Sequence, residues 1–170
     1  MVAMDVVLRS GVRYMRHTTL LTELQQSSVL AISRLTAELL ETNENALRGD
    51  EISYVAFGSP RSPDGGTTFD GANNLQWHKV VAYYIAPYQG ETALYRKERA
   101  FPTPNPGPPL IDGSENLAYW TAAPFPRQLV AERVYHLDVV SSTTIDVIIG
   151  VKSQDGQFVI IGQTNVKARN

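Results

Sequence analysis

Residues 18–48, TTLLTELQQSSVLAISRLTAELLETNENALR, decide the fold. Apolar and small residues recur in this stretch with the 3.6-residue period of an α-helix, which indicates a helix with one face to bury. That face comprises Leu21, Leu24, Ser28, Ile32, Leu35, Leu39 and Ala46, flanked by Val29, Leu40 and Leu47. The opposite side is expected to carry Glu23, Arg34, Glu38, Glu41 and Arg48.

This helix is longer than one small domain needs for its own core. At about 1.5 Å per residue it spans roughly 45 Å, and the apolar stripe continues backwards through Tyr14 as far as Ala3. We therefore expect the helix to begin before its packed part and to project from the domain. At its other end, Arg48 suits the negative pole of the helix dipole, and Gly49 suits the position after the last helical residue.

Length and composition favour one soluble domain without disulfides. The chain has 170 residues, no cysteine and a net charge of -2, so thiolate metal sites are excluded and a nucleic-acid partner is disfavoured. Residues 1–17 are too short and too charged to cross a membrane. Their apolar residues, followed by Arg9, Arg13 and Arg16, are nevertheless typical of the end of a membrane span at the interface.

The rest of the chain alternates strand and turn signals. Predicted strands cover residues 51–57, 76–85, 92–99, 133–140, 143–152 and 157–166. Residues 58–74 and 101–127 are predicted to be loops, the second because its run PTPNPGPP offers few N–H groups to a sheet. These features predict a single α+β domain over residues 1–170, with an N-terminal helix within residues 1–48 packed on an antiparallel sheet within residues 51–170.

The order of several short motifs carries a resemblance to a known family. A long amphipathic helix leads into ISYVAF, a strand ending VVAYYI follows, LYRKE comes after a glycine turn, and the chain closes with TNVKARN. This order resembles the minor pseudopilins of type II secretion and type IV pilus systems, especially the J-type pseudopilin. The resemblance implies a pilin-like fold and a non-enzymatic structural subunit of the filament tip, which acts in assembly and contacts secreted cargo.

The resemblance also implies where the protein resides and what it binds. The family's cleaved leader, and the apolar span that follows it, are not in this sequence, so we expect a soluble ectodomain of an inner-membrane protein, located in the periplasm. Other minor pseudopilins are the expected partners, bound through the N-terminal helix ahead of about Leu24. The predicted packing and assembly residues are Tyr14, Leu21, Leu24, Ile32, Leu35 and Leu39.

No catalytic residue or cofactor is predicted, because the standard catalytic and nucleotide-binding motifs are missing. His17 and the strand residues His78 and His136 are each interpreted as isolated histidines, although Asp138 shares a strand face with His136. Calcium is the one weak metal candidate. Its oxygen ligands would come from Asp112, Glu115 and Asn116, or from Asp64 and Asp70, and neither set has the spacing of a dedicated calcium loop.

The aromatic residues leave one alternative open. Strand aromatics usually belong to the core, but Tyr119 and Trp120 follow a proline-rich stretch and are predicted to form a partner patch. The alternative function is a free-standing binding module or enzyme, with a ligand groove near residues 101–127. The aromatics available for such a groove are Trp77, Tyr83, Tyr84, Tyr95, Tyr119, Trp120 and Phe125.

Overall fold

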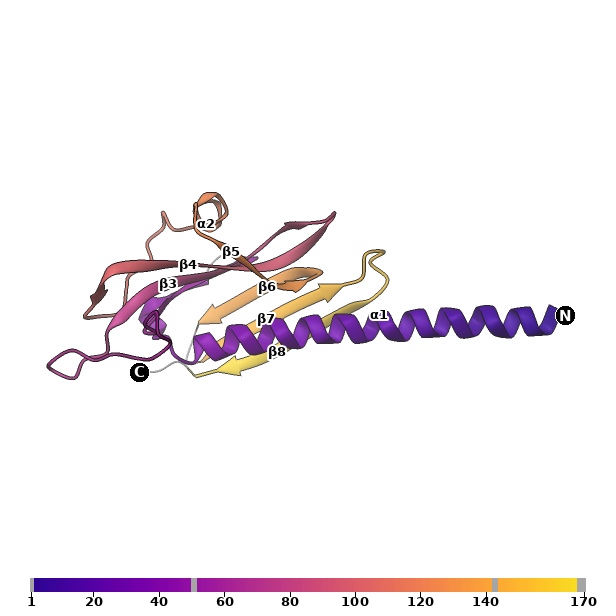
Figure 1. The fold of residues 1–170 in the computed structure, drawn as a ribbon, viewed down its shortest axis with the longest axis horizontal. Coiled ribbons are helices and arrows are strands. Elements are labelled where there is room, and N and C mark those ends of the chain that lie inside the picture. The colour runs from indigo at the N-terminus through magenta and orange to yellow at the C-terminus, as the bar shows by residue number, and fades with distance from the viewer. Residues whose placement is uncertain (1, 50–51, 142–143, 168–170) are drawn as a thin grey trace.

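A 38-residue helix and two antiparallel sheets make up the described part of the protein (Figure 1). The structure is a computed structural model that describes residues 2–49, 52–141 and 144–167. Its elements are α1 (Val2–Leu39), the 3₁₀ helix η1 (Glu44–Ala46), β1 (Leu47–Arg48), β2 (Tyr54–Ser59), β3 (Trp77–Tyr88), β4 (Glu91–Asn105), α2 (Leu117–Ala122), β5 (Arg127–Glu132), β6 (Val134–Ser141), β7 (Ile145–Lys152) and β8 (Val159–Val166). The predicted α+β class is confirmed.

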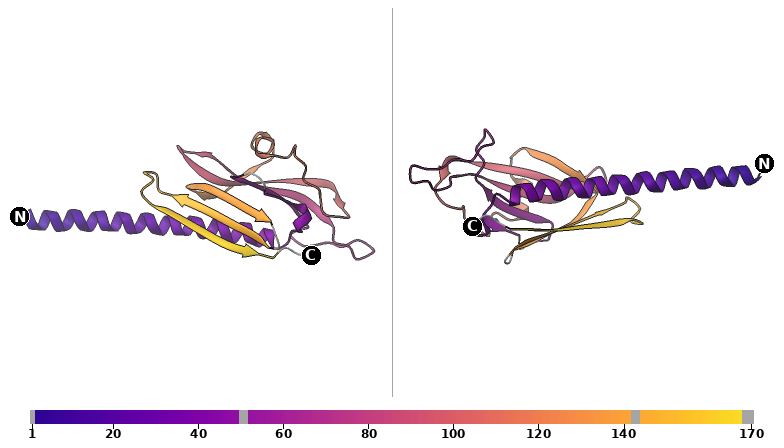
Figure 2. Two further views of the ribbon diagram at one scale, coloured as in Figure 1. Left: turned by 180° about the vertical axis from the view of Figure 1, so that it is seen from behind. Right: turned by 90° about the horizontal axis from the view of Figure 1, so that it is seen from below.

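The strands form one sheet of five and one of three. The larger sheet has the order β1-β2-β3-β4-β5 and the smaller the order β6-β7-β8, and all neighbouring strands are antiparallel. The helix α1 runs along both sheets, and its N-terminal part extends beyond them (Figures 1 and 2). The projection expected from the long apolar stripe is therefore present.

The helix ends nine residues earlier than predicted, at Leu39 rather than Arg48. The Thr42 hydroxyl donates to the Gly58 carbonyl oxygen at 2.8 Å, and the Asn43 side chain accepts from the Asn45 N–H at 2.9 Å. These local side-chain bonds compete with helical ones and turn the chain towards β2. Arg48 thus lies in β1, opposite Ala56, and does not cap a helix.

Residues 101–127, predicted to be a loop, contain the end of β4, the whole of α2 and the first residue of β5. Strand β4 continues to Asn105, which pairs with Trp77 after a shift in register, and α2 and β5 follow. The prolines in this run favoured a strand end at residue 99, but the end of a long strand tolerates proline where pairing is irregular. The turn between β3 and β4 lies at Gln89 and Gly90, both with positive φ, within the predicted turn at residues 87–91, and both strands extend closer to it than predicted.

The other predicted boundaries lie close to the observed ones. The predicted loop at residues 58–74 overlaps the last two residues of β2, and the last three predicted strands match β6, β7 and β8 within two residues at each end. Glu51, Thr143 and the terminal Arg169 and Asn170 lie outside the described residues.

The five-stranded sheet has a hydrophobic core on each face. The first core lies between α1 and the two sheets, and includes Leu35, Phe57 and Ile149. The second lies on the opposite face of the five-stranded sheet, where Trp120 of α2 packs with Tyr84 and Tyr95. The larger sheet is therefore buried on both faces near its centre.

Candidate interaction surface

The segment of α1 at residues 10–16 is exposed at every position. Val12, Tyr14 and Met15 keep 48, 74 and 70% of their surface accessible. The segment ends where the His17 ring meets the edge of the Phe158 ring, with centroids 5.2 Å apart. Several large apolar side chains are thus displayed on the projecting helix without support from the domain.

The predicted assembly residues divide between this exposed part and the core. Tyr14 is exposed and Leu21 is 36% exposed, whereas Leu24, Leu35 and Leu39 are fully buried. Ile32 is partly buried against the same core. Leu24 therefore belongs to the domain's own core and is unavailable for subunit contacts, which corrects the predicted division of the helix at that residue.

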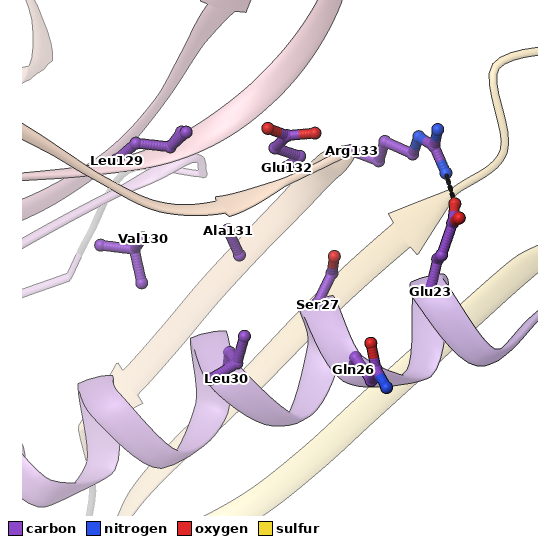
Figure 3. Close-up of a pocket in the computed structure, with 9 residues that line it drawn as sticks. All are labelled: Glu23, Gln26, Ser27, Leu30, Leu129, Val130, Ala131, Glu132 and Arg133. Carbon is purple, nitrogen blue, oxygen red and sulfur yellow. Dashed lines mark hydrogen bonds and ion pairs between the residues drawn. The ribbon is translucent and has the colours of Figure 1, made fainter. Parts of the chain in front are cut away.

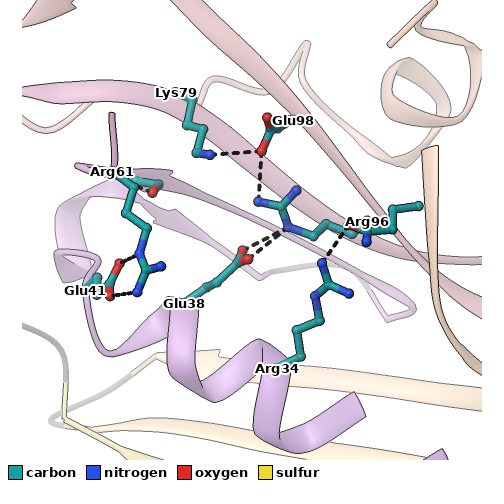
Figure 4. Close-up of polar contacts among 9 residues, drawn as sticks. Arg34, Glu38, Glu41, Arg61, Lys79, Arg96 and Glu98 are labelled. Atoms are coloured by element: carbon teal, nitrogen blue, oxygen red, sulfur yellow. Dashed lines mark hydrogen bonds and ion pairs between the residues drawn. The ribbon is translucent and has the colours of Figure 1, made fainter. Parts of the chain in front are cut away.

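Charged side chains of α1 bind the larger sheet instead of pointing to solvent (Figure 4). Glu38 accepts from Arg96 Nε of β4 at 3.0 and 3.1 Å, and Arg34 donates to the Gln128 side chain of β5 at 2.6 Å. Just after the helix, Glu41 accepts from Arg61 Nε at 2.6 Å. We call this set of contacts the polar clamp.

Electrostatics at the centre of the polar clamp favours the charged forms. Burial disfavours the Arg96 guanidinium, but the charge and hydrogen bonds of Glu38 outweigh it and raise the pKa of Arg96. Burial likewise disfavours the Glu98 carboxylate, yet hydrogen bonds from Lys79 and Arg96 lower the pKa of Glu98. Burial also raises the pKa of the neighbouring Tyr83 hydroxyl. Arg96 and Glu98 are therefore held in their charged forms.

The same flank of α1 carries a further ion pair towards the N-terminus (Figure 3). Glu23 accepts from Arg133 Nη1 at 3.0 Å, and Arg133 Nε lies 3.3 Å from Glu91. Arg48, beyond the helix, donates to the Asp112 carbonyl oxygen. The prediction that Glu23, Arg34, Glu38, Glu41 and Arg48 occupy the side opposite the core is therefore wrong, since each has a partner on the sheets or their loops.

The outward side of α1 is left without charge. Between Leu24 and Leu39, every exposed side chain is uncharged, because Arg34 and Glu38 are both half-buried in the polar clamp. The residues at helical spacing on this side form what we call the outer stripe: Met15, Thr19, Thr22, Gln26, Val29, Leu30, Ser33 and Ala37. Val29 and Leu30 are 65 and 58% exposed. A helix facing solvent normally places its charges on that side.

Sequence analysis missed the residues that create this surface. Arg96 and Arg133 were assigned only to strands, and Gln128 lay just after the predicted loop at residues 101–127. The available signal was the excess of uncharged residues at positions 15, 19, 22, 26, 29, 30, 33 and 37, which share one side of a helical wheel.

The predicted partner patch does not form as expected. Trp120 is fully buried in the second core, and only Tyr119 is exposed, at 36%. Lys97 fixes α2 there by donating its Nζ to the carbonyl oxygens of Trp120 and Ala123, each at 2.7 Å. Trp120 is buried because one side of the short helix α2 faces the five-stranded sheet. The aromatics considered for a ligand groove are likewise mostly buried in the two cores.

Four of the weak calcium candidates, Asp70, Asp112, Glu115 and Asn116, have protein partners. Asp112 accepts from the Ser114 N–H at 2.6 Å, Glu115 pairs with Arg99 at 2.6 Å, and Asn116 caps α2. Asp70 similarly accepts from its own turn at residues 72 and 74. No group of three or more His, Cys, Asp or Glu residues suited to a metal occurs in the described ranges. The calcium site stays a prediction without support.

The histidines lie on three different elements. His17 is on α1, His78 on β3 next to the Thr68 hydroxyl, and His136 on β6 beside the Tyr135 ring. Asp138 shares a strand with His136, as predicted, but among the residues described no third metal ligand lies with them.

Fold and surface together define an α+β domain that presents one face of a long helix. Within the described residues, no helix is long and apolar enough to cross a membrane. Comparison of the chain with protein families, with characterised proteins and with solved structures finds no match. The function must therefore be argued from the surface itself.

Proposed function

We propose that this protein is a structural, non-enzymatic subunit of the minor pseudopilin type, which joins sibling subunits through α1. The subunits would form the tip of a short filament of a type II secretion or type IV pilus system. The tip would start assembly and contact secreted cargo. In this arrangement the outer stripe packs against uncharged faces of neighbouring helices, while the sheets and loops form the outside of the filament.

The outer stripe is the observation that carries the proposal. Charged groups are costly to bury without partners, so a helix face meant for burial in an assembly should be free of them. Here Glu38 and Glu41 pair with Arg96 and Arg61, and Arg34 donates to the Gln128 side chain, so each of these charged groups has a partner within the domain. The threonine, serine and alanine side chains of the stripe are small enough for close helix approach.

The exposed apolar residues of the projecting segment extend the same face. Val12 and Met15 are 48 and 70% exposed on a segment that makes no core of its own. As in the family that the sequence resembles, the proposal places the domain in the periplasm, with α1 directed towards the inner membrane. The helix would then be the connection between a membrane anchor and the filament tip.

The test is a co-purification with co-expressed sibling pilin-like subunits of the same secretion or pilus system. We expect Met15→Lys and Val29→Lys each to reduce the recovered complex at least about tenfold, because each buries a charge in the helix interface. Ile161→Lys is the matched control, since Ile161 is 64% exposed, close to the 65% of Val29, but lies on β8.

Circular dichroism should show that all three variants remain folded. Unchanged complex formation by the two α1 variants would refute the helix assignment. Loss of the complex with Ile161→Lys alone would instead show that the interface lies on the three-stranded sheet.

A further inference from the structure

The outer edge of β5 is open. β5 is the last strand of the five-stranded sheet, and β4 is the only strand that pairs with it among the described residues. A strand in this position presents backbone N–H and C=O groups to any further strand that can align with it. An open edge therefore recognises extended polypeptide rather than a helix or a small molecule.

A groove separates this edge from α1, so the helix does not cover it (Figure 3). The groove has a volume of about 350 Å³ and is lined on the helix side by Gln26, Ser27 and Leu30 and on the strand side by residues 129–133. The Glu23–Arg133 ion pair closes one end. Leu30, 58% exposed, would be partly covered by a strand placed there.

The sequence of β5, RQLVAE, is complementary to itself when two copies run antiparallel. Alignment about its centre places Arg127 opposite Glu132 of the second copy, twice by symmetry, and Gln128 opposite Ala131. Both charged residues are exposed, and neither makes an ion pair with another residue that the structure describes.

A bulge in β5 makes this alignment feasible. In a regular strand, residues 127 and 132 would point to opposite faces of the sheet. The register between β4 and β5 shifts at Val130, which is the extra residue. The Arg127 guanidinium consequently lies over the Tyr95 ring at 4.8 Å, on the face away from α1, and Glu132 points to that same face (Figure 3).

We propose that the β5 edge pairs with the β5 edge of a second copy of this chain, giving a two-fold dimer with one continuous ten-stranded sheet. Two Arg127–Glu132 pairs fix the register, and the Leu129–Val130 step lies at the two-fold axis. The contact is short, so the dimer belongs to the weak, concentration-dependent class. Pairing also covers an edge that would otherwise accept strands without control.

This dimer is distinct from the helix assembly proposed above. The two-fold axis is normal to the sheet, so it reverses the direction of α1, and the two helices run antiparallel rather than parallel. The dimer therefore does not rest on the proposed function, and either proposal can fail without the other.

Sedimentation velocity of the whole chain over a concentration series tests the dimer. We expect a monomer–dimer equilibrium that Arg127→Glu and Glu132→Arg each weaken by about tenfold, since each sets like charges against one another at both ends. The double variant Arg127→Glu/Glu132→Arg restores the pairs and should associate within about threefold of the wild type. Lys167→Glu and Asp64→Arg are exposed controls with the same charge changes.

Rescue by the double variant supports the proposal, because a general effect of net charge or of misfolding cannot produce it. A monomer at every concentration overturns it, and so does a dimer whose affinity is unchanged by the Arg127 and Glu132 substitutions. A chain that stays monomeric yet binds a fluorescent peptide containing RQLVAE also overturns it, because the occupant of the edge is then a foreign strand and not a second copy.

Discussion

The two sheets hold the same helix in different ways. The three-stranded sheet meets α1 through close apolar contact at Gly162 of β8, where an added Cβ would lie 2.2 Å from Ile32 Cδ1 and 2.8 Å from Ser28 Oγ. The five-stranded sheet meets the helix flank through the polar clamp, with Glu38 and Arg96 at its centre. One contact depends on shape and the other on charge.

This difference explains the composition of the third side of the helix. The apolar residues of α1 pack in the core, and its charged residues bind partners on the flank that faces β4 and β5. The outer stripe therefore carries only small, amide and apolar side chains. An amphipathic helix can thus present an uncharged surface without losing its charges, provided that the domain supplies partners for them.

The largest expected effect comes from the shared core. Leu35 is fully buried between α1 and both sheets. Leu35→Ala should lower the free energy of unfolding by about 3 kcal/mol, through lost burial and a residual cavity. Leu30→Ala, on the same helix but 58% exposed, should cost less than about 0.5 kcal/mol. Urea unfolding measures both. Equal losses would mean that the outer stripe is already buried, for example in an oligomer.

The apolar contact with the smaller sheet gives the next effect. Gly162→Ala forces Ile32 away from β8 and should cost about 1–2 kcal/mol. Ile32→Val removes the Cδ1 atom that a new Cβ would meet. The loss in free energy of unfolding of the double variant should therefore be smaller than the sum of the two single losses by at least about 0.5 kcal/mol. Strict additivity in urea unfolding would show that α1 does not sit on Gly162.

Much of the fold can be predicted from local sequence patterns. The helical period placed Leu24, Ser28, Leu35 and Leu39 of α1 correctly in the core, although Leu21, Val29 and Leu40 of the predicted face are exposed. Alternation with turn residues placed the last three strands, because this signal also arises from neighbouring residues. Leu24, Leu35 and Leu39 needed no tertiary information to be assigned to the core side. The end of the helix did need it, because Thr42 bonds to Gly58, a residue that is distant in sequence.

The surface was harder to predict for the same reason. A charge on a helix is normally solvent-facing, so the wheel alone assigned Arg34 and Glu38 to the open side. Their true position depends on Gln128 and Arg96, which are 94 and 58 residues away. Trp120 was likewise misplaced, because the turn that directs it inward is fixed by Lys97 on another strand.

The smallest expected effect uses pH to separate the ion pairs that support Arg96 from the apolar contact at Gly162. Glu98 accepts from Lys79 Nζ at 3.0 Å and forms an ion pair with Arg96 at 2.9 Å. Its pKa in the folded protein is lower than the ordinary value of 4.5. The unfolded chain then binds the proton more strongly, so this contribution to stability is present above about pH 4.5 and is lost as the pH falls through the folded value.

Glu98→Gln should accordingly lower the free energy of unfolding at pH 7 by about 0.5 kcal/mol, the scale of a half-exposed ion pair. The difference from the wild type should shrink on acidification and vanish below the folded pKa of Glu98. Gly162→Ala should keep a constant difference over the same range, because its contact involves no titrating group. Urea unfolding at several pH values compares the two. A constant difference for Glu98→Gln would show that the Glu98 carboxylate adds nothing to the hold on Arg96, which would then come from Glu38 alone.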